Sequence, residues 1–473
     1  MQAPFYQQIV KSRKANTILA LRMCWRKPFA LLMHLLLLWA VPIKAQDTAW
    51  TLEDCLHYAQ VHNLSIKEQE LDLRVAAMNY EVSKLSHIPQ LSLSSSYGTS
   101  FGRSINPTTN QFENTQFSSL GLGASSSVLL FGWFQKHHAV KNESLRLEQA
   151  VQARQQFSNE VALNVTTAYL RALLAREQIA NMSYQAAISR EHKSRMERLL
   201  EAGRSNMLEL SQANSQLATD SGLYYRSVLN YEQALIELKA ILNLDFKVAI
   251  EPVPLKDDTL PFYDGKTDPE ALYLQAAAQH PEVIRTGLGI NIAKRALKIA
   301  RAGSLPQLSS YYATGTNYSS SFYEIQPNGE RQLMHLGKQL NNNLSQSFGL
   351  SLSVPLFNGF SYKKAIRNAG YEIEKAKLAE LNARQRLRKN IYAACSDYEI
   401  ALKQYLAAES LVLHARNAFQ GAKVRFENGL ISHFEYLSEQ NNLLKAQNEA
   451  TALKYDLQFK QLRLDCYRKG CGE

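Results

Sequence analysis

The chain has 473 residues and a formal net charge of +11. Seven Lys and Arg residues, and no Asp or Glu, fall within residues 1–45, so the remainder carries only +4 (11 − 7). A charge this modest argues against a nucleic-acid partner, and the length alone allows two to four ordinary domains.

A secretory signal is predicted for residues 1–45. Cationic residues precede the apolar run FALLMHLLLLWAV at 29–41, and Ala45 is a candidate for the last residue removed. The run is too short and too early for a transmembrane helix, and no lipobox-like stretch predicts a lipid anchor. The cysteines that follow are too few and too scattered for a disulfide framework: Cys55, Cys395, Cys466 and Cys471. The last two either pair or remain free thiols.

Matching segments predict an internal repeat. One match pairs IPQLSLSSSYG (88–98) with LPQLSSYYATG (305–315) at an offset of 217 residues. Two later matches have an offset of 226: LLFGWF (129–134) with PLFNGF (355–360), and AGRSNMLEL (202–210) with NGLISHFEY (428–436). The nine-residue difference predicts a longer hairpin loop in the second copy, around 321–343.

We therefore predict two repeats, residues 46–250 and 268–473, joined by an irregular linker rich in Pro and Asp at 251–267. Each repeat is expected to contain a helix, two strands, a very long helix and a last helix. Residues 1–45 are assigned to the leader.

The predicted strands have one bulky face and one almost bare face. The even positions 92–102 and the odd positions 345–353 are all Ser or Gly, whereas most positions between them are bulky. A soluble sandwich would place Lys, Glu or Thr on its wet face. The bare face suits the inside of a barrel with an open lumen.

The long helices are predicted from apolar residues at strict three- and four-residue spacing, which favours a left-handed coiled coil. In the second copy these residues are Ile391, Ala394, Tyr398, Ala401, Tyr405, Ala408, Val412, Ala415, Phe419, Ala422 and Phe426. In the first copy they are Val165, Ala168, Ala172, Ala175, Ile179, Met182 and Ala186. No Pro interrupts either run, so each helix of about 67 residues is roughly 100 Å long.

Four strands in one chain cannot close a barrel, and open strand edges are forbidden in lipid because unpaired backbone groups cannot reach water. Single-chain bacterial barrels begin at about eight strands. Three chains would supply twelve strands, so an obligate trimer is expected, with the long helices continuing the wall as a tube.

Together these features resemble the TolC family of outer-membrane efflux and secretion channels. The resemblance covers nearly all of the chain after the leader. It is carried by VPLFNGF and its twin VLLFGWF, and by the G-x(5)-E turns at Gly203/Glu209 and Gly429/Glu435. It implies a mixed α+β membrane protein: a trimeric twelve-stranded β-barrel in the outer membrane, continued in the periplasm by a coiled-coil α-helical barrel.

The function that the resemblance implies is the exit duct of a tripartite efflux pump or type I secretion system. The implied partners are a periplasmic adaptor and an inner-membrane transporter of the RND or ABC type. No enzyme activity, cofactor or metal is implied. The sequence does not indicate the cargo or the energy source of the transporter.

By the same resemblance, Glu435 matches the acidic ring of the periplasmic entrance, and Glu209 is its counterpart in the first copy. Ser438 occupies the place of a second carboxylate, and Ile431 that of a basic gate residue. The alternative is that both glutamates only start helices, where the helix dipole favours a negative charge.

The resemblance also implies that the adaptor docks at the helix tips, for which the candidate residues are Gly203, Arg204, Gly429 and Leu430. Aromatic residues where strands become helices are expected to form a girdle at the membrane rim, with core packing as the alternative: Phe131, Trp133, Phe134, Phe357 and Phe360. Three tyrosines, Tyr311, Tyr312 and Tyr318, are expected to reach the outer rim or lipid.

Two other classes of protein remain as alternatives. An enzyme is disfavoured, because GTSFG around Ser100 lies within the Ser/Gly alternation rather than at a strand-to-helix elbow, and His137-His138 has no accompanying ligand pattern. A periplasmic coiled-coil adaptor is the second alternative. It would have a single hairpin rather than two repeated hairpins with strands.

Overall fold

The computed structural model describes residues 49–105, 110–255, 268–327 and 329–470, and Ala49–Glu473 form one compact unit. The predicted leader, most of the predicted linker and Cys471 lie outside the described residues. The fold mixes α and β structure, as expected. No helix in the described ranges is both long and apolar enough to span a bilayer.

The order of elements in the first half recurs in the second half. The first half contains β1 (Ala49–Trp50), α2 (Leu52–His62), α3 (Leu64–Leu85), β2 (Gln90–Ile105), β3 (Phe112–Phe131), α4 (Gln135–Glu201) and α5 (Met207–Leu242). The second contains β4 (Glu251–Pro252), α6 (Pro269–Gln279), α7 (Pro281–Ala302), β5 (Gln307–Ser319), β8 (Ser345–Ser353), α9 (Ser361–Glu427) and α10 (His433–Lys469).

The expected longer loop of the second half lies between the paired strands β5 and β8. It contains β6 (Tyr323–Ile325), β7 (Arg331–Leu333) and α8 (Leu336–Asn342). Gln339 of α8 is fully buried, and its side-chain amide donates to the carbonyl of Ser319 and accepts from the Ser319 N–H. The β5–β8 pairing stops at Gly315, so α8 satisfies the backbone of β5 beyond that point.

The helix expected at the start of each repeat is two helices. Asn63 breaks the first with an extended backbone, and its side chain accepts hydrogen bonds from the N–H groups of Ser65 and Ile66. In the second half, His280 is extended before Pro281, which starts α7. A local cap and a proline therefore interrupt patterns that read as single helices.

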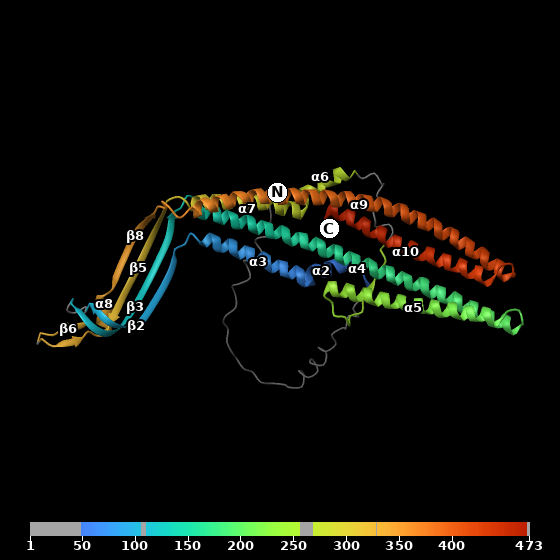
Figure 1. Cartoon of the computed structure of the whole chain (residues 1–473), viewed down its shortest axis with the longest axis horizontal. Coiled ribbons are helices and arrows are strands. Elements are labelled where there is room, and N and C mark those ends of the chain that lie inside the picture. Colours follow the sequence, from blue (N-terminus) through green and yellow to red (C-terminus); the bar gives the residue numbers. More distant parts are fainter. Residues whose placement is uncertain (1–48, 106–109, 256–267, 328, 471–473) are drawn as a thin grey trace, which may run out of the picture. The chain divides into compact units, whose positions relative to one another are not determined.

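The predicted long helices are confirmed, since α4 and α9 each contain 67 uninterrupted residues. Every residue of the two predicted apolar stripes is buried or half-buried. Helix α4 packs against α5, and α9 packs against α10, so each half contains a long antiparallel hairpin (Figure 1).

The four long strands form one antiparallel sheet in the order β2-β3-β5-β8 (Figure 1). Small residues face each other across β2 and β3; Ser92 pairs with Ser125, and their hydroxyls lie 2.8 Å apart. The side chains of Leu350 and Leu352 in β8 point to the opposite face of the sheet, and they are 62% and 65% exposed. The two-faced character predicted for β2 and β8 is thus present in the sheet.

The bare face is not complete, because the ring of Tyr311 lies on it. Tyr311 pairs with Ser127 and Gly349, on the Ser/Gly face. A Cβ at Gly349 would lie only 2.6 Å from the Tyr311 hydroxyl oxygen, so the ring covers this glycine. Because neighbouring residues of a strand point to opposite faces, Tyr311 and Tyr312 cannot both reach lipid.

Candidate functional site

The hairpin tips have the glycine turns that the sequence predicts. Gly203 and Gly429 have φ values of +67° and +71°, in the left-handed region that favours glycine. After α4, the N–H groups of Gly203 and Arg204 donate to the carbonyls of Leu200 and Leu199. The same pattern follows α9, where the N–H of Leu430 donates to the carbonyl of Arg425. Both helices therefore end in a Schellman motif.

Both candidate entrance glutamates lie in the first turn of a helix. The Glu435 carboxylate accepts from the N–H of Ser432 at 3.0 Å, and the Ser432 hydroxyl accepts from the N–H of Glu435. This is a capping box. Glu209 accepts from the Ser205 hydroxyl at 2.6 Å. The helix-start role is therefore present. The side chains of Glu435 and Ser438 are also exposed and lie about one helical turn apart.

A buried histidine pair that the sequence analysis missed joins the two hairpins near their tips. Nε2 of His192 in α4 lies 2.8 Å from Nδ1 of His433 in α10, and the rings stack with centroids 4.6 Å apart. The rings of Phe426 and Tyr436 pack against His192. No sequence signal indicates this pair, because the two histidines are not equivalent positions of the repeat.

Burial controls the protonation of this pair. Burial, with smaller contributions from the charges of His433 and Arg195, lowers the pKa of His192 to about 4. Burial also lowers the pKa of His433, opposed by the nearby carboxylate of Glu209. Both rings are therefore neutral at neutral pH. Nε2 of His433 has no partner among the described residues, which favours a tautomer in which Nδ1 of His433 is the donor.

A second buried polar cluster lies farther along the same hairpins. The Asp220 carboxylate of α5 is 1% exposed and accepts hydrogen bonds from Ser189, Gln185 and Gln216. Gln440 of α10 donates to the Ser189 hydroxyl at 3.3 Å. This network fixes the contact between the hairpins by hydrogen bonds rather than by apolar packing alone.

The strand-to-helix junctions place the candidate rim aromatics outside the core. Trp133 and Phe134 have φ values of +52° and +61°, and Gly359 and Phe360 have +60° and +62°. The two junctions thus turn in the same way, although the first of these two positions is a glycine in only one of them. The indole of Trp133 donates to the carbonyl of Pro306 at 2.9 Å. All five candidates are between 43% and 77% exposed, which argues against core packing within the chain: Phe131, Trp133, Phe134, Phe357 and Phe360.

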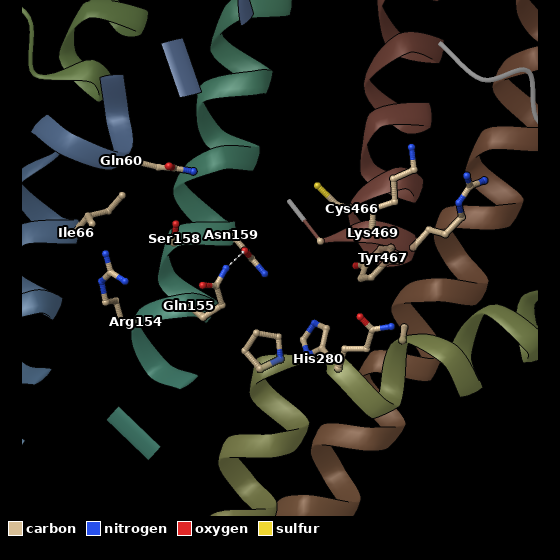
Figure 2. A pocket seen from close by; sticks show the side chains of 15 residues that line it. Gln60, Ile66, Arg154, Gln155, Ser158, Asn159, His280, Cys466, Tyr467 and Lys469 are labelled. Atoms are coloured by element: carbon tan, nitrogen blue, oxygen red, sulfur yellow. Dashed lines mark hydrogen bonds between the residues drawn. The ribbon is translucent and has the colours of Figure 1, made fainter. Parts of the chain in front are cut away.

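A cavity of about 440 Å³ lies among α2, α3, α4, α6, α7 and the end of α10 (Figure 2). Its lining includes Gln155, Ser158, His280 and Lys469. The described residues offer no hydrogen bond between Ser158 and His280 that would activate a nucleophile. Ser100 lies within β2 and pairs with Phe117, so the expectation that it is not a hydrolase nucleophile agrees with its position.

Comparisons with known proteins connect this geometry to one family. The outer membrane efflux protein family matches residues 55–244 and 272–467. Alkaline protease secretion protein AprF of Pseudomonas aeruginosa is 26% identical over 66% of this chain, and the match spans 61% of AprF. Outer membrane protein TolC of Vibrio cholerae is 22% identical, over 86% of this chain and 89% of its own length. Cation efflux system protein CusC of Escherichia coli is 23% identical, over 86% and 83%.

Solved structures share the fold. A crystal structure of CusC matches with a TM-score of 0.73 at 17% identity, covering 89% of this chain and 92% of that chain. The outer membrane protein VceC of Vibrio cholerae matches with a TM-score of 0.72 at 15% identity, covering 89% and 96%.

Proposed function

The chain belongs to the outer membrane efflux protein family, and from this premise we propose that it is the outer-membrane exit duct of a tripartite efflux pump or type I secretion system. The observation that supports the duct most directly is the sheet. Among the described strands, β2 and β8 each pair on one side only, and the sheet has one apolar and one small-residue face.

A sheet with two open edges is not stable in lipid, because the unpaired N–H and C=O groups lack partners there. We propose that β2 of one copy pairs with β8 of the next, and that three copies close a twelve-stranded barrel. The bulky face then meets lipid and the Ser/Gly face lines the lumen. The repeats proposed for 46–250 and 268–473, with their linker at 251–267, supply two hairpins per chain to a helical tube.

We propose that the helix tips form the periplasmic entrance. Three copies of Glu435 would form an acidic ring, with Ser438 and Glu209 nearby. The turns containing Gly203, Arg204, Gly429 and Leu430 are the proposed docking site for a periplasmic adaptor. The rim aromatics Phe131, Trp133, Phe134, Phe357 and Phe360 would lie at the inner edge of the membrane.

The relatives favour neither class of transporter. AprF is named for protease secretion and CusC for cation efflux, so both an ABC and an RND partner remain candidates. The alternative of a periplasmic adaptor is wrong, because the family consists of outer membrane proteins. Since the related solved structures are of channels rather than enzymes, we propose no catalytic activity for this chain.

The test is to express the full chain, extract membranes with high salt and then with detergent, and measure conductance of the purified protein in planar bilayers. We expect extraction only by detergent, a trimer on chemical cross-linking, and discrete conductance steps. A processed chain that is released by salt and remains monomeric without detergent would overturn the proposal.

A further inference from the structure

Three helix segments next to the sheet are strongly basic. Residues 135–142 of α4, 290–302 of α7 and 361–371 of α9 contain no Asp or Glu. They contain nine Lys and Arg residues: Lys136, Lys141, Lys294, Arg295, Lys298, Arg301, Lys363, Lys364 and Arg367. Within the described part of the chain none of the nine forms an ion pair, and the next ion pairs along α4 and α9, Arg146–Glu143 and Lys375–Glu372, lie beyond these segments.

The segments belong to neighbouring elements, so their charges add. Helix α7 packs against both α4 and α9, and all three meet the strands at the same end (Figure 1). Nη1 of Arg295 lies 3.3 Å from Nδ1 of His138. Burial, followed by the charges of Lys298 and Arg295, lowers the pKa of His138. We call the nine residues the basic collar.

The five cations of the basic collar on α4 and α9 are unfavourably placed within a single chain. Cations at the start of α4 and α9 oppose the positive end of the helix dipole, where an acidic residue is preferred. Neither helix has an acidic residue in its first turn. Mutual repulsion of the cations adds to this, so an external anion would stabilise the arrangement.

The first turns of α9 contain the most defined part of the collar. A cavity of about 370 Å³ is lined by Phe360, Lys363, Lys364, Arg367, Asn368 and Tyr371. Their three- and four-residue spacing places them on one face of the helix. Nζ of Lys363 lies 5.8 Å from the centre of the Phe360 ring. The cavity thus combines three cations, an amide and two aromatic rings, without a carboxylate.

We propose that Lys363, Lys364 and Arg367 bind the phosphate group of an anionic phospholipid in the leaflet that borders this end of the sheet. The inference rests on the proposed function, which places the bulky face of the sheet against lipid. The strand β8 of that sheet ends at Ser353, and the exposed ring of Phe357, four residues later, lies 5.7 Å from the ring of Phe360, which lines the cavity. Acyl chains along β8 would place a headgroup at the start of α9, where the cations and the aromatic rings match the chemistry of the membrane interface.

The test measures binding of phosphatidylglycerol to the detergent-purified full chain by native mass spectrometry, with phosphatidylethanolamine as the net-neutral comparison. The test variant combines Lys363→Gln, Lys364→Gln and Arg367→Gln. The matched control combines Lys389→Gln, Lys403→Gln and Arg416→Gln, which removes three exposed cations elsewhere on α9. Each Lys or Arg near an anionic surface contributes about fivefold in affinity, so the test variant should bind phosphatidylglycerol on the order of 100-fold more weakly.

The control and the wild type should bind phosphatidylglycerol equally, and binding of phosphatidylethanolamine should be the same in all three proteins. Equal binding of phosphatidylglycerol by the test variant would overturn the proposal. If inorganic phosphate displaced phosphatidylglycerol and bound with the same affinity as the lipid, the cavity would be assigned to free phosphate. That result would also overturn the proposal. A trimer lost in the test variant, with lipid binding per chain unchanged, would assign the cations to the contact between copies.

If the triple variant does not assemble, the single variant Lys364→Gln replaces it. This variant is expected to bind phosphatidylglycerol about fivefold more weakly than the wild type. Conductance of every preparation is measured in planar bilayers. Conductance without a preference for phosphatidylglycerol contradicts this inference alone, whereas a wild-type protein that does not conduct contradicts the proposed function.

Discussion

At the start of α10, Glu435 both caps the helix and carries a charge at the exposed tip. Glu435→Gln separates the two roles, because glutamine also serves at this position of a capping box. We expect the melting temperature to stay unchanged. We expect the divalent-cation concentration that half-blocks conductance in planar bilayers to rise about tenfold, since the attraction of a charged ring is lost.

Glu449→Gln, which removes an exposed charge farther along α10, is the control and should leave the block unchanged. Unchanged block in Glu435→Gln would show that this carboxylate does not face the lumen.

The lowered pKa of His192 predicts that the folded protein loses stability in mild acid. Its folded pKa of about 4 lies below the ordinary value of 6.5, so below pH 6.5 the unfolded chain binds a proton before the folded chain does. Stability is therefore fully present above pH 6.5 and declines as the pH falls to about 4, by about 3 kcal/mol. Apparent melting temperatures of the purified protein across this range measure the effect.

The variant His192→Phe tests the cause of this decline. Phenylalanine keeps the aromatic stack but cannot bind a proton. We expect a lower melting temperature at neutral pH, because the hydrogen bond to His433 is lost, and a smaller decline in acid. His414→Phe changes an exposed histidine of α9 and should leave the decline as in the wild type. A decline as large in His192→Phe as in the wild type would assign it to other groups, such as carboxylates.

Among the elements, the strand-to-helix junctions depend on backbone conformation more than on contacts. A Cβ at Gly359 would meet nothing within 4 Å, but φ is +60°. Gly359→Ala should therefore destabilise the protein by about 1 kcal/mol through backbone strain alone.

Gly370→Ala is the matched control, since Gly370 lies within α9 with equally open surroundings and no positive φ. It should stabilise the protein by up to about 1 kcal/mol. Denaturant unfolding of the detergent-purified variants measures both, and shifts of the same sign would contradict this account of the junction.

The elements also show which features were predictable from the sequence and why. The lengths of α4 and α9 follow from an apolar stripe that no proline interrupts, which is a property of a continuous segment. The turns at Gly203 and Gly429 follow from local residue preference. The breaks at Asn63 and His280 were missed, because a side-chain cap at Asn63 and the proline at 281 each override the periodic pattern around them.

The features that were not predictable arise from tertiary contact or from strain. His192 and His433 are 241 positions apart and on different hairpins, and only packing of the hairpins brings them together. Trp133 adopts a left-handed backbone that its residue type disfavours by about 1–2 kcal/mol. Only its match to Gly359 hints at this conformation. Its hydrogen bond to Pro306 and its ring contact with Phe131 offset part of that strain.

At the scale of the whole molecule, the proposed duct has an inside and an outside, and the sheet assigns each residue to one of them. Leu350 and Ser351 are consecutive in β8 and point to opposite faces; Leu350 pairs with Ser310, and Ser351 with Ser309. Both side chains are exposed in the single chain. Their surroundings differ only after copies assemble in a membrane, so the two positions test the assembly itself.

Leu350→Arg would place a cation on the proposed lipid face, which costs roughly 2–4 kcal/mol near the bilayer midplane and less toward the interface. We expect little trimer in outer membrane fractions. Ser351→Arg would place the same cation in the lumen, where water hydrates it, so the trimer should form and its preference for cations over anions should fall. Cross-linked trimer in membrane fractions and reversal potentials in planar bilayers measure the two outcomes. If Ser351→Arg blocked assembly while Leu350→Arg did not, the sheet would be inverted relative to the proposal, because the face with small residues would then be the one that needs an apolar environment.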